Sequence, residues 1–154
     1  MKFTTKGLSM GDAYEVVMED VPHDCVLMVV SELHGLAGSV FPPEIDGIVV
    51  DLHAWSHSAL RSEERQRNFC LIQRLGDFSL GGSARLKVLL LRVIGFNGAI
   101  DVEVSFDAEP SDVQMLMQEF QTLFFCLKRC SGAGAICGGM EPVADSATRI
   151  FMHG

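Results

Sequence analysis

The stretch from Arg85 to Gly139, RLKVLLLRVIGFNGAIDVEVSFDAEPSDVQMLMQEFQTLFFCLKRCSGAGAICGG, carries the strongest structural signals in this chain. It opens with an apolar run over residues 85–96 that has the composition of a buried strand. After Asn97-Gly98, apolar and polar residues alternate over 99–107, which is typical of a half-buried strand. Because Asn-Gly tolerates the positive φ angles of a two-residue turn, these runs predict an antiparallel hairpin.

A long amphipathic helix is expected next, over residues 111–129. Pro110 suits a first helical turn, and Ser111 and Gln114 have the spacing of a capping box. Gly132 is suited to end the helix. A stripe of this width packs against a sheet, so we expect the helix to cover one face of the hairpin. The apolar stripe consists of Val113, Leu116, Met117, Phe120, Leu123, Phe124 and Leu127.

Outward from this stretch, the remaining segments supply further strands and a second helix. AYEVVMED (13–20) is consistent with an opening strand, and TRIFMHG (148–154) with a final one. CVLMVVSELHG (25–35) favours a helix because its ending is helix-like, although its β-branched run also suits a strand. GIVVDLHAW (47–55) alternates as a strand does, and residues 56–82 suggest a surface helix followed by a short strand.

This order of elements predicts an α+β fold. It is the ferredoxin-like βαββαβ order, a sandwich whose mainly antiparallel sheet has two helices on one face and an added hairpin strand. A chain of 154 residues fits one domain, so residues 1–154 are expected to form a single domain.

The composition limits the classes of protein to which this chain can belong. The longest apolar runs fall well short of the roughly 20 residues that span a bilayer, and the start has no apolar signal core, so we expect a cytoplasmic protein. Five cysteines form no dense framework, which favours reduced thiols. The net charge of −8 argues against a free-standing nucleic-acid binder. The charge is segregated, however: residues 61–92 hold seven basic and three acidic residues, whereas 93–127 hold six acidic and none basic.

Candidate catalytic and metal-binding residues are few. His53 and His57 are four apart, and Ser56 lies beside His57, but no zinc-protease or nucleophile-elbow motif accompanies them. A strand ending at 55 would also separate the two imidazole rings. The cysteines Cys126, Cys130 and Cys137 lack the paired short spacings of a zinc site and are interpreted as small hydrophobic residues. The sequence therefore predicts no cofactor, no metal and no enzymatic activity.

Two further features admit a functional interpretation. The carboxylates of Asp101, Glu103 and Asp107 would share one face of a strand, where a solvated outer face explains them without catalysis. The glycine-rich segment SGAGAICGG (131–139) is either a plain connection from helix to strand or a loop whose amides contact phosphate. Its glycines are Gly132, Gly134, Gly138 and Gly139.

Three segments give the chain a family resemblance over about two thirds of its length. EIDGIVVDLHAWS (44–56), GGSARLKVLLLRVIGFNG (81–98) and LMQEFQTLFFCLKRCSGAGAICGGMEP (116–142) are similar to parts of the RAMP superfamily of CRISPR proteins. They look most like the tail subunit that holds the 5′ handle of the guide RNA in type I-F surveillance complexes. The chain is shorter than that subunit and has an extra strand.

The resemblance implies a non-catalytic RNA-binding and assembly subunit of a CRISPR-type ribonucleoprotein complex. Its partners would be other protein subunits and guide RNA, with neither a membrane nor a small-molecule substrate involved. The RNA phosphates would be contacted by the loop amides of the four glycines together with Lys128 and Arg129. Electrostatic support would come from Arg61, Arg65, Arg67 and Arg85.

An alternative is a small acidic protein-interaction module, such as an inhibitor, immunity or adaptor protein, that binds a basic partner surface. Its contact residues would be Asp101, Glu103 and Asp107, with Phe125 as an apolar anchor off the main helical stripe. A third reading, a hydrolase built on His53, Ser56 or His57, has less support in the sequence.

Overall fold

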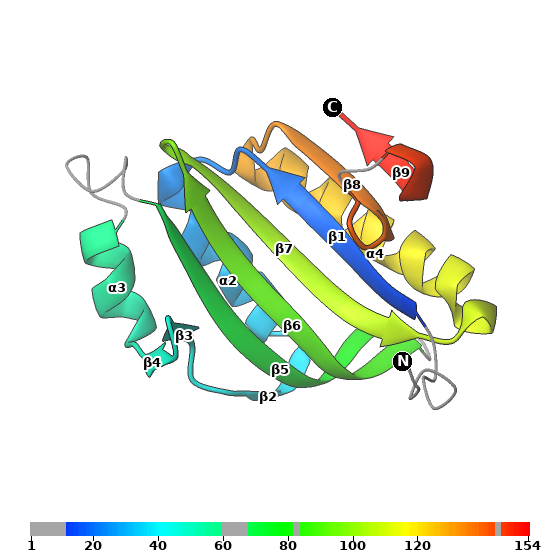
Figure 1. Cartoon of the computed structure of the whole chain (residues 1–154), viewed down its shortest axis with the longest axis horizontal. Coiled ribbons are helices and arrows are strands. Elements are labelled where there is room, and N and C mark those ends of the chain that lie inside the picture. The colour runs from blue at the N-terminus through cyan, green and yellow to red at the C-terminus, as the bar shows by residue number, and fades with distance from the viewer. Residues whose placement is uncertain (1–11, 60–67, 82–83, 144–145) are drawn as a thin grey trace, which may run out of the picture.

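A computed structural model describes residues 12–59, 68–81, 84–143 and 146–154 of the chain. Within these ranges, a curved antiparallel sheet of nine strands is backed by helices on one of its faces (Figure 1). The fold is α+β, which confirms the predicted fold class.

The strands pair in the order β4-β3-β5-β6-β7-β1-β8-β9, with β2 also pairing with β5, and every pairing is antiparallel. In chain order, the strands are β1 (Asp12–Glu19), β2 (Ala37–Val40), β3 (Glu44–Ile45), β4 (Ile48–Val49), β5 (Phe69–Gly81), β6 (Ala84–Phe96), β7 (Ala99–Ala108), β8 (Ala135–Met140) and β9 (Arg149–His153).

Two helices, α2 (Val26–His34) and α4 (Pro110–Ser131), lie behind the sheet in Figure 1. A third, α3 (Leu52–Ala59), lies beside the sheet, beyond β5. Short 3₁₀ helices precede α2 and β9; they are η1 (His23–Cys25) and η3 (Ser146–Thr148). We call the face opposite α2 and α4 the open face of the sheet.

The predicted hairpin is confirmed. Strands β6 and β7 meet at a two-residue turn in which Asn97 has φ 53° and Gly98 has φ 86°. Phe96 pairs with Ala99 on either side of this turn. These are the left-handed backbone angles for which the Asn-Gly pair is suited.

The predicted helix is also confirmed, with one correction at its start. Helix α4 begins at Pro110, its N-cap residue is Glu109, and no side chain caps it, so the predicted capping box of Ser111 and Gln114 is wrong. Once Pro110 takes the first helical position, Ser111 lies inside the helix and cannot act as the cap. At the other end, Gly132 has φ 83° and donates its N–H to the Lys128 carbonyl oxygen at 2.8 Å.

The apolar stripe of α4 faces the core, as predicted. Phe120 lies at the centre of an aromatic stack, with its ring centroid 4.9 Å from that of Phe106 and 6.1 Å from that of Phe78. Each of these rings comes from a different element, so the stack joins α4 to β7 and β5. The buried stripe residues are Leu116, Met117, Phe120, Phe124 and Leu127, with Val113 and Leu123 packed at the margin of the core.

Within the segment 25–35, residues Val26–His34 form helix α2, so the helix and not the strand is the correct interpretation of its sequence. The apolar residues of α2 that lie three or four positions apart are buried together: Val26, Val29, Val30 and Leu33. Burial of one helical face outweighs the strand preference of the β-branched residues, because packing contributes more than local propensity. The predicted opening and final strands, β1 and β9, are confirmed as well.

The predicted strand over 47–55 is wrong. Only Ile48 and Val49 are extended, and α3 begins at Leu52. The reason is Asp51, whose carboxylate accepts the main-chain N–H of Ala54 at 2.8 Å and so caps the first turn of a helix. The strand that follows, β5, is 13 residues long and not the short strand expected.

The glycine-rich segment 131–139 is a loop only at its start. From Ala135 onward it is β8, which pairs with β1 on one side and β9 on the other, and Gly138 and Gly139 are buried in it. Gly138 leaves room for the Phe151 ring, and Gly139 for the backbone at Thr148 and Arg149. The finer prediction of a ferredoxin-like sandwich is not confirmed, because the sheet is larger than that fold requires.

A candidate protein-docking face

Successive side chains of β7 point to opposite faces of the sheet. Its even-numbered side chains from Ile100 to Ala108 are buried, whereas its odd-numbered ones face away from the helices. Asp101, Glu103 and Asp107 therefore share the open face, as the alternation predicts. Their environments differ, however: Asp107 is exposed, whereas Asp101 and Glu103 are partly buried.

The middle of the open face is a charge cluster around Arg92 of β6. Its Nε donates to Glu103 Oε1 at 2.8 Å. Its Nη2 lies 3.5 Å from Glu15 Oε1 and 3.6 Å from Glu141 Oε2. Burial raises the pKa of Glu103, although the Arg92 guanidinium partly opposes this. Three carboxylates share one guanidinium, so the cluster stays negative overall when all of them are ionised.

Glu15 ties this cluster to the segment that follows β8. Its residue surface is only 7% exposed, and its Oε2 accepts the main-chain N–H of Val143 at 2.7 Å. Val143 is thereby held over Val17 and Cys137, with which it forms a small buried cluster. Burial raises the pKa of the Cys137 thiol to about 11, so this cysteine stays protonated at neutral pH.

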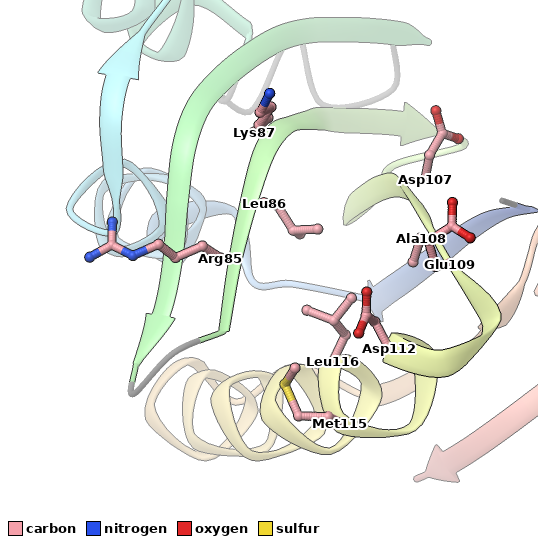
Figure 2. Close-up of a pocket in the computed structure, with 9 residues that line it drawn as sticks. All are labelled: Arg85, Leu86, Lys87, Asp107, Ala108, Glu109, Asp112, Met115 and Leu116. Carbon is pink, nitrogen blue, oxygen red and sulfur yellow. The ribbon is translucent and has the colours of Figure 1, made fainter. Parts of the chain in front are cut away.

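A groove opens where β6 and β7 part. Their pairing runs from Phe96/Ala99 to Leu90/Ser105 and ends there, although both strands continue. Two hollows of about 550 and 450 Å³ occupy the gap and share Leu86, Lys87 and Asp107. We call this the split groove. Figure 2 shows the first hollow, which is lined by Arg85, Leu86, Lys87, Asp107, Ala108, Glu109, Asp112, Met115 and Leu116.

The walls of the split groove differ in charge. Asp107, Glu109 and Asp112 lie on the side of β7 and the start of α4, whereas Arg85 and Lys87 lie on β6 (Figure 2). All five side chains are exposed, and within the described ranges every ion pair involves Arg92 instead. The groove therefore presents charges that are available to a partner.

Apolar side chains extend this surface across β6 and β5. Val88 is 52% exposed and Ile72 is 41% exposed, and a further hollow of about 240 Å³ lies beside Ile72. The Arg74 guanidinium lies 6.0 Å from the centre of the Phe41 ring at its margin. Exposed apolar area next to free charges is typical of a surface that binds another protein.

The residues predicted to bind RNA are not brought together. Gly138 and Gly139 are buried in β8, and the Gly134 N–H is already bonded to the Glu19 carbonyl oxygen at 2.8 Å.

The basic residues predicted to bind RNA lie apart from one another. Arg85 and Met115 both line the split groove, whereas Lys128 and Arg129 lie at the far end of α4, roughly 20 Å along its axis from Met115. Gly132 forms the left-handed cap that ends α4. Arg61, Arg65 and Arg67 lie outside the described residues.

The predicted apolar anchor, Phe125, lies away from the acidic strand. The residue is 43% exposed, and its ring makes an edge contact with His153 of β9, at 5.8 Å between ring centroids. The side-chain nitrogen Nε2 of Gln121 lies 2.6 Å from Nε2 of the same imidazole. Phe125 and Asp107 thus do not form one surface.

The three candidate catalytic residues, His53, Ser56 and His57, all lie in α3. Ser56 is buried, and its hydroxyl donates to the His53 carbonyl oxygen at 2.8 Å within α3. His53 is exposed, and the side chain of His57 lies outside the description. Among the described residues, no group of three or more His, Cys, Asp or Glu side chains is arranged to hold a metal ion. No described helix is long and apolar enough to cross a membrane.

Two features of this face were missed from the sequence. One is the Glu15–Val143 contact, which joins residues 128 positions apart. The other is the split groove. A signal existed for the carboxylate partners of Arg92, Glu15 among them: Arg92 is the only charged residue from Val88 to Phe96, and a partly buried charge requires partners. No local pattern indicates where two strands part.

Residues 12–153 match the model of a protein family described as PABL017 Cdi1I immunity protein. The chain belongs to this immunity protein family. The match runs from the first residue of β1 to the last residue of β9, so the family covers the whole described sheet.

A solved structure has the same fold as this immunity family member. It is the crystal structure of the toxic C-terminal tip of CdiA from Pseudomonas aeruginosa in complex with immune protein. One chain of that complex matches with a TM-score of 0.81 and 23% sequence identity, over 92% of this chain and 94% of that chain. A search of curated proteins finds no match.

These findings overturn the resemblance to the RAMP superfamily, and with it the predicted function as an RNA-binding subunit of a CRISPR complex. The likeness rested on hydrophobic patterns and glycines, and the glycines of β8 serve packing between strands. Guide RNA is not supported as a partner. The alternative, an acidic interaction module of the inhibitor or immunity type, is the reading that the family match supports.

Proposed function

We propose that this chain binds the toxic C-terminal tip of a CdiA protein and neutralises it. The observation that carries the proposal is the family match, which spans residues 12–153. The fold adds support, because a chain with the same topology occurs in a complex between a CdiA tip and an immune protein.

The proposed mode of action is occlusion by binding, without a chemical step. On the open face, Arg92 is engaged by three carboxylates, and the Ser56 hydroxyl is engaged by its own helix. The groups that remain available, in the split groove and along the apolar part of β5 and β6, suit recognition of another protein. We place this activity in the cytoplasm, where the five free cysteines would stay reduced.

Co-expression with the toxin tests the proposal. The CdiA tip encoded by the same organism is expressed from an inducible promoter, with and without this chain. We expect growth to be restored by this chain and not by an immunity protein of a different family. The purified proteins should also form a stable complex that survives nuclease treatment. Continued toxicity together with no complex would refute the proposal.

A titration separates occlusion from catalysis. If the chain acts by binding, toxin activity should fall in proportion to the amount of chain added and vanish near one equivalent. Full neutralisation by a small fraction of an equivalent would instead reveal enzymatic turnover and contradict this mode of action.

A further inference from the structure

The split groove is bordered by strand edges that lack a strand partner. On β6, Leu86, Val88 and Leu89 pair with β5 on one side only. On β7, Phe106, Asp107 and Ala108 pair with β1 on one side only. Within the described ranges, no strand pairs with the two edges that face each other across the groove.

The hairpin turn determines which main-chain groups point into the gap. Residues that flank a two-residue turn exchange hydrogen bonds, so Phe96 and Ala99 direct their N–H and C=O groups at each other. Every second residue from these positions does the same where the side chains alternate, which holds in β6 from Phe96 back to Val88 and in β7 from Ala99 to Ala108. Val88, eight positions before Phe96, and Asp107, eight positions after Ala99, therefore direct their main-chain groups into the split groove.

The base of the groove is apolar. Leu86 and Leu116 are buried there, and Met115 of α4, a residue that is 41% exposed, lies beside them (Figure 2). An extended segment lying between β6 and β7 would place alternate side chains over this base and the others toward solvent. Main-chain bonds would supply affinity, and the base would select apolar side chains.

The charge on the groove wall favours basic residues among the partner's other side chains. Asp107, Glu109 and Asp112 line the wall on the side of β7 and α4; all three are exposed, and none forms an ion pair with another described residue. The chain as a whole carries a net charge of −8. A basic side chain next to β7 would meet this wall favourably, whereas an acidic one would be repelled.

We propose that an extended segment of the toxin tip, with alternating apolar and basic side chains, adds as a strand between β6 and β7. The inference rests on the proposed function, because it names where and how the same partner binds. It commits to strand addition, in which the partner's backbone bonds to Val88 and Asp107 and its apolar side chains cover Leu86 and Met115.

Amide hydrogen exchange tests the main-chain part directly. Exchange is compared between the free chain and its complex with the CdiA tip, in peptides that cover 84–90 and 105–109. We expect strong slowing of exchange at Val88 and Asp107 in the complex, with little change in β9. A complex in which these amides exchange as fast as in the free chain overturns strand addition but leaves the proposed function intact.

Variants test the main-chain and charge parts separately. Val88→Pro removes one main-chain N–H in the groove, and Val88→Thr keeps it as the matched control. Asp107→Lys reverses a charge on the wall, and Glu119→Lys makes the same change at an exposed site of α4 outside the groove. We expect Val88→Pro and Asp107→Lys each to weaken binding by at least about tenfold, and the two controls by less than about twofold.

Folding is checked for each variant by its thermal unfolding transition before affinity is measured. If Val88→Pro does not fold, the exchange measurement and the Asp107→Lys comparison still decide. Equal losses in Asp107→Lys and Glu119→Lys would overturn the charge assignment. A dimer of the free chain with the same amides protected would show instead that the groove is filled by a second copy.

Discussion

The carboxylate of Glu15 accepts a 2.7 Å hydrogen bond from the main-chain N–H of Val143, which lies 128 residues later in the chain. Glu15 also faces Arg92, so one buried side chain links β1, β6 and the segment after β8. Val143 in turn covers Val17 and Cys137. This contact holds the segment that follows β8 against the open face.

Replacing Glu15 with Ala should destabilise the fold. The buried N–H of Val143 would lose its acceptor, and an unsatisfied buried donor costs about 1–3 kcal/mol. Urea unfolding measures the change in the free energy of unfolding. Glu141→Ala is the control, because Glu141 faces the same guanidinium with a side chain that is 38% exposed. Equal effects of the two variants would contradict a special role for Glu15.

Asp101 should make stability depend on pH. Burial raises the pKa of its carboxyl, although a hydrogen bond from the Asp20 N–H partly opposes this. A carboxyl whose pKa is higher in the folded state retains its proton there, so its contribution to stability falls as pH rises above its ordinary value of 3.8. Asp101→Asn, which removes the ionisation, should therefore raise stability at pH 7 more than at pH 4.

Urea midpoints at the two pH values measure this effect of Asp101→Asn. Asp107→Asn removes an exposed carboxylate from the same face of β7 and serves as the control for a change in net charge. A gain in stability that is the same at both pH values would show that ionisation of Asp101 is not its source.

Removing the Phe120 ring should cost more than removing any exposed ring of α4. Phe120 is fully buried and stacks on Phe106 and Phe78, so Phe120→Ala leaves a cavity that joins three elements. We expect a loss of about 3–5 kcal/mol in the free energy of unfolding. Phe125→Ala, on the exposed side, should cost less than about 1 kcal/mol. Chemical denaturation of both variants provides the comparison.

Gly139→Ala should destabilise the chain through its backbone neighbours. A Cβ at this position would meet the Thr148 carbonyl oxygen and the Arg149 Cα, neither of which can move as a flexible side chain would. Forcing an extra carbon into such a contact costs about 1–3 kcal/mol.

The matched control for Gly139→Ala is Gly35→Ala, because the nearest atom to a Cβ at Gly35 lies at 3.4 Å and its backbone is right-handed helical. Calorimetric unfolding temperatures compare the two variants. Wild-type stability in Gly139→Ala would mean that β8 and the segment before β9 are not packed as closely as described.

The elements predicted correctly are those whose signals are local. The Asn97-Gly98 turn, the stripe of α4 and the buried face of α2 each depend on residues within a few positions of one another. The errors arose where a nearby residue or a distant neighbour changed the outcome. In the alternating stretch 47–55, Asp51 caps a helix, so that α3 forms where a strand was predicted. The glycine-rich segment predicted as a loop is mostly strand β8, because it pairs with β1 and β9.

The sequence by itself determined the α+β class, the hairpin, helix α4 and the shared face of Asp101, Glu103 and Asp107, because periodicity is a property of consecutive residues. Only the tertiary structure decided that Glu103 is paired with Arg92, while Asp107 is exposed and has no ion pair among the residues that the structure describes. It alone also decided that β6 and β7 part beyond Leu90 and Ser105. Both depend on strand register and curvature over the whole sheet, which arise from long-range contacts and leave no pattern in neighbouring residues.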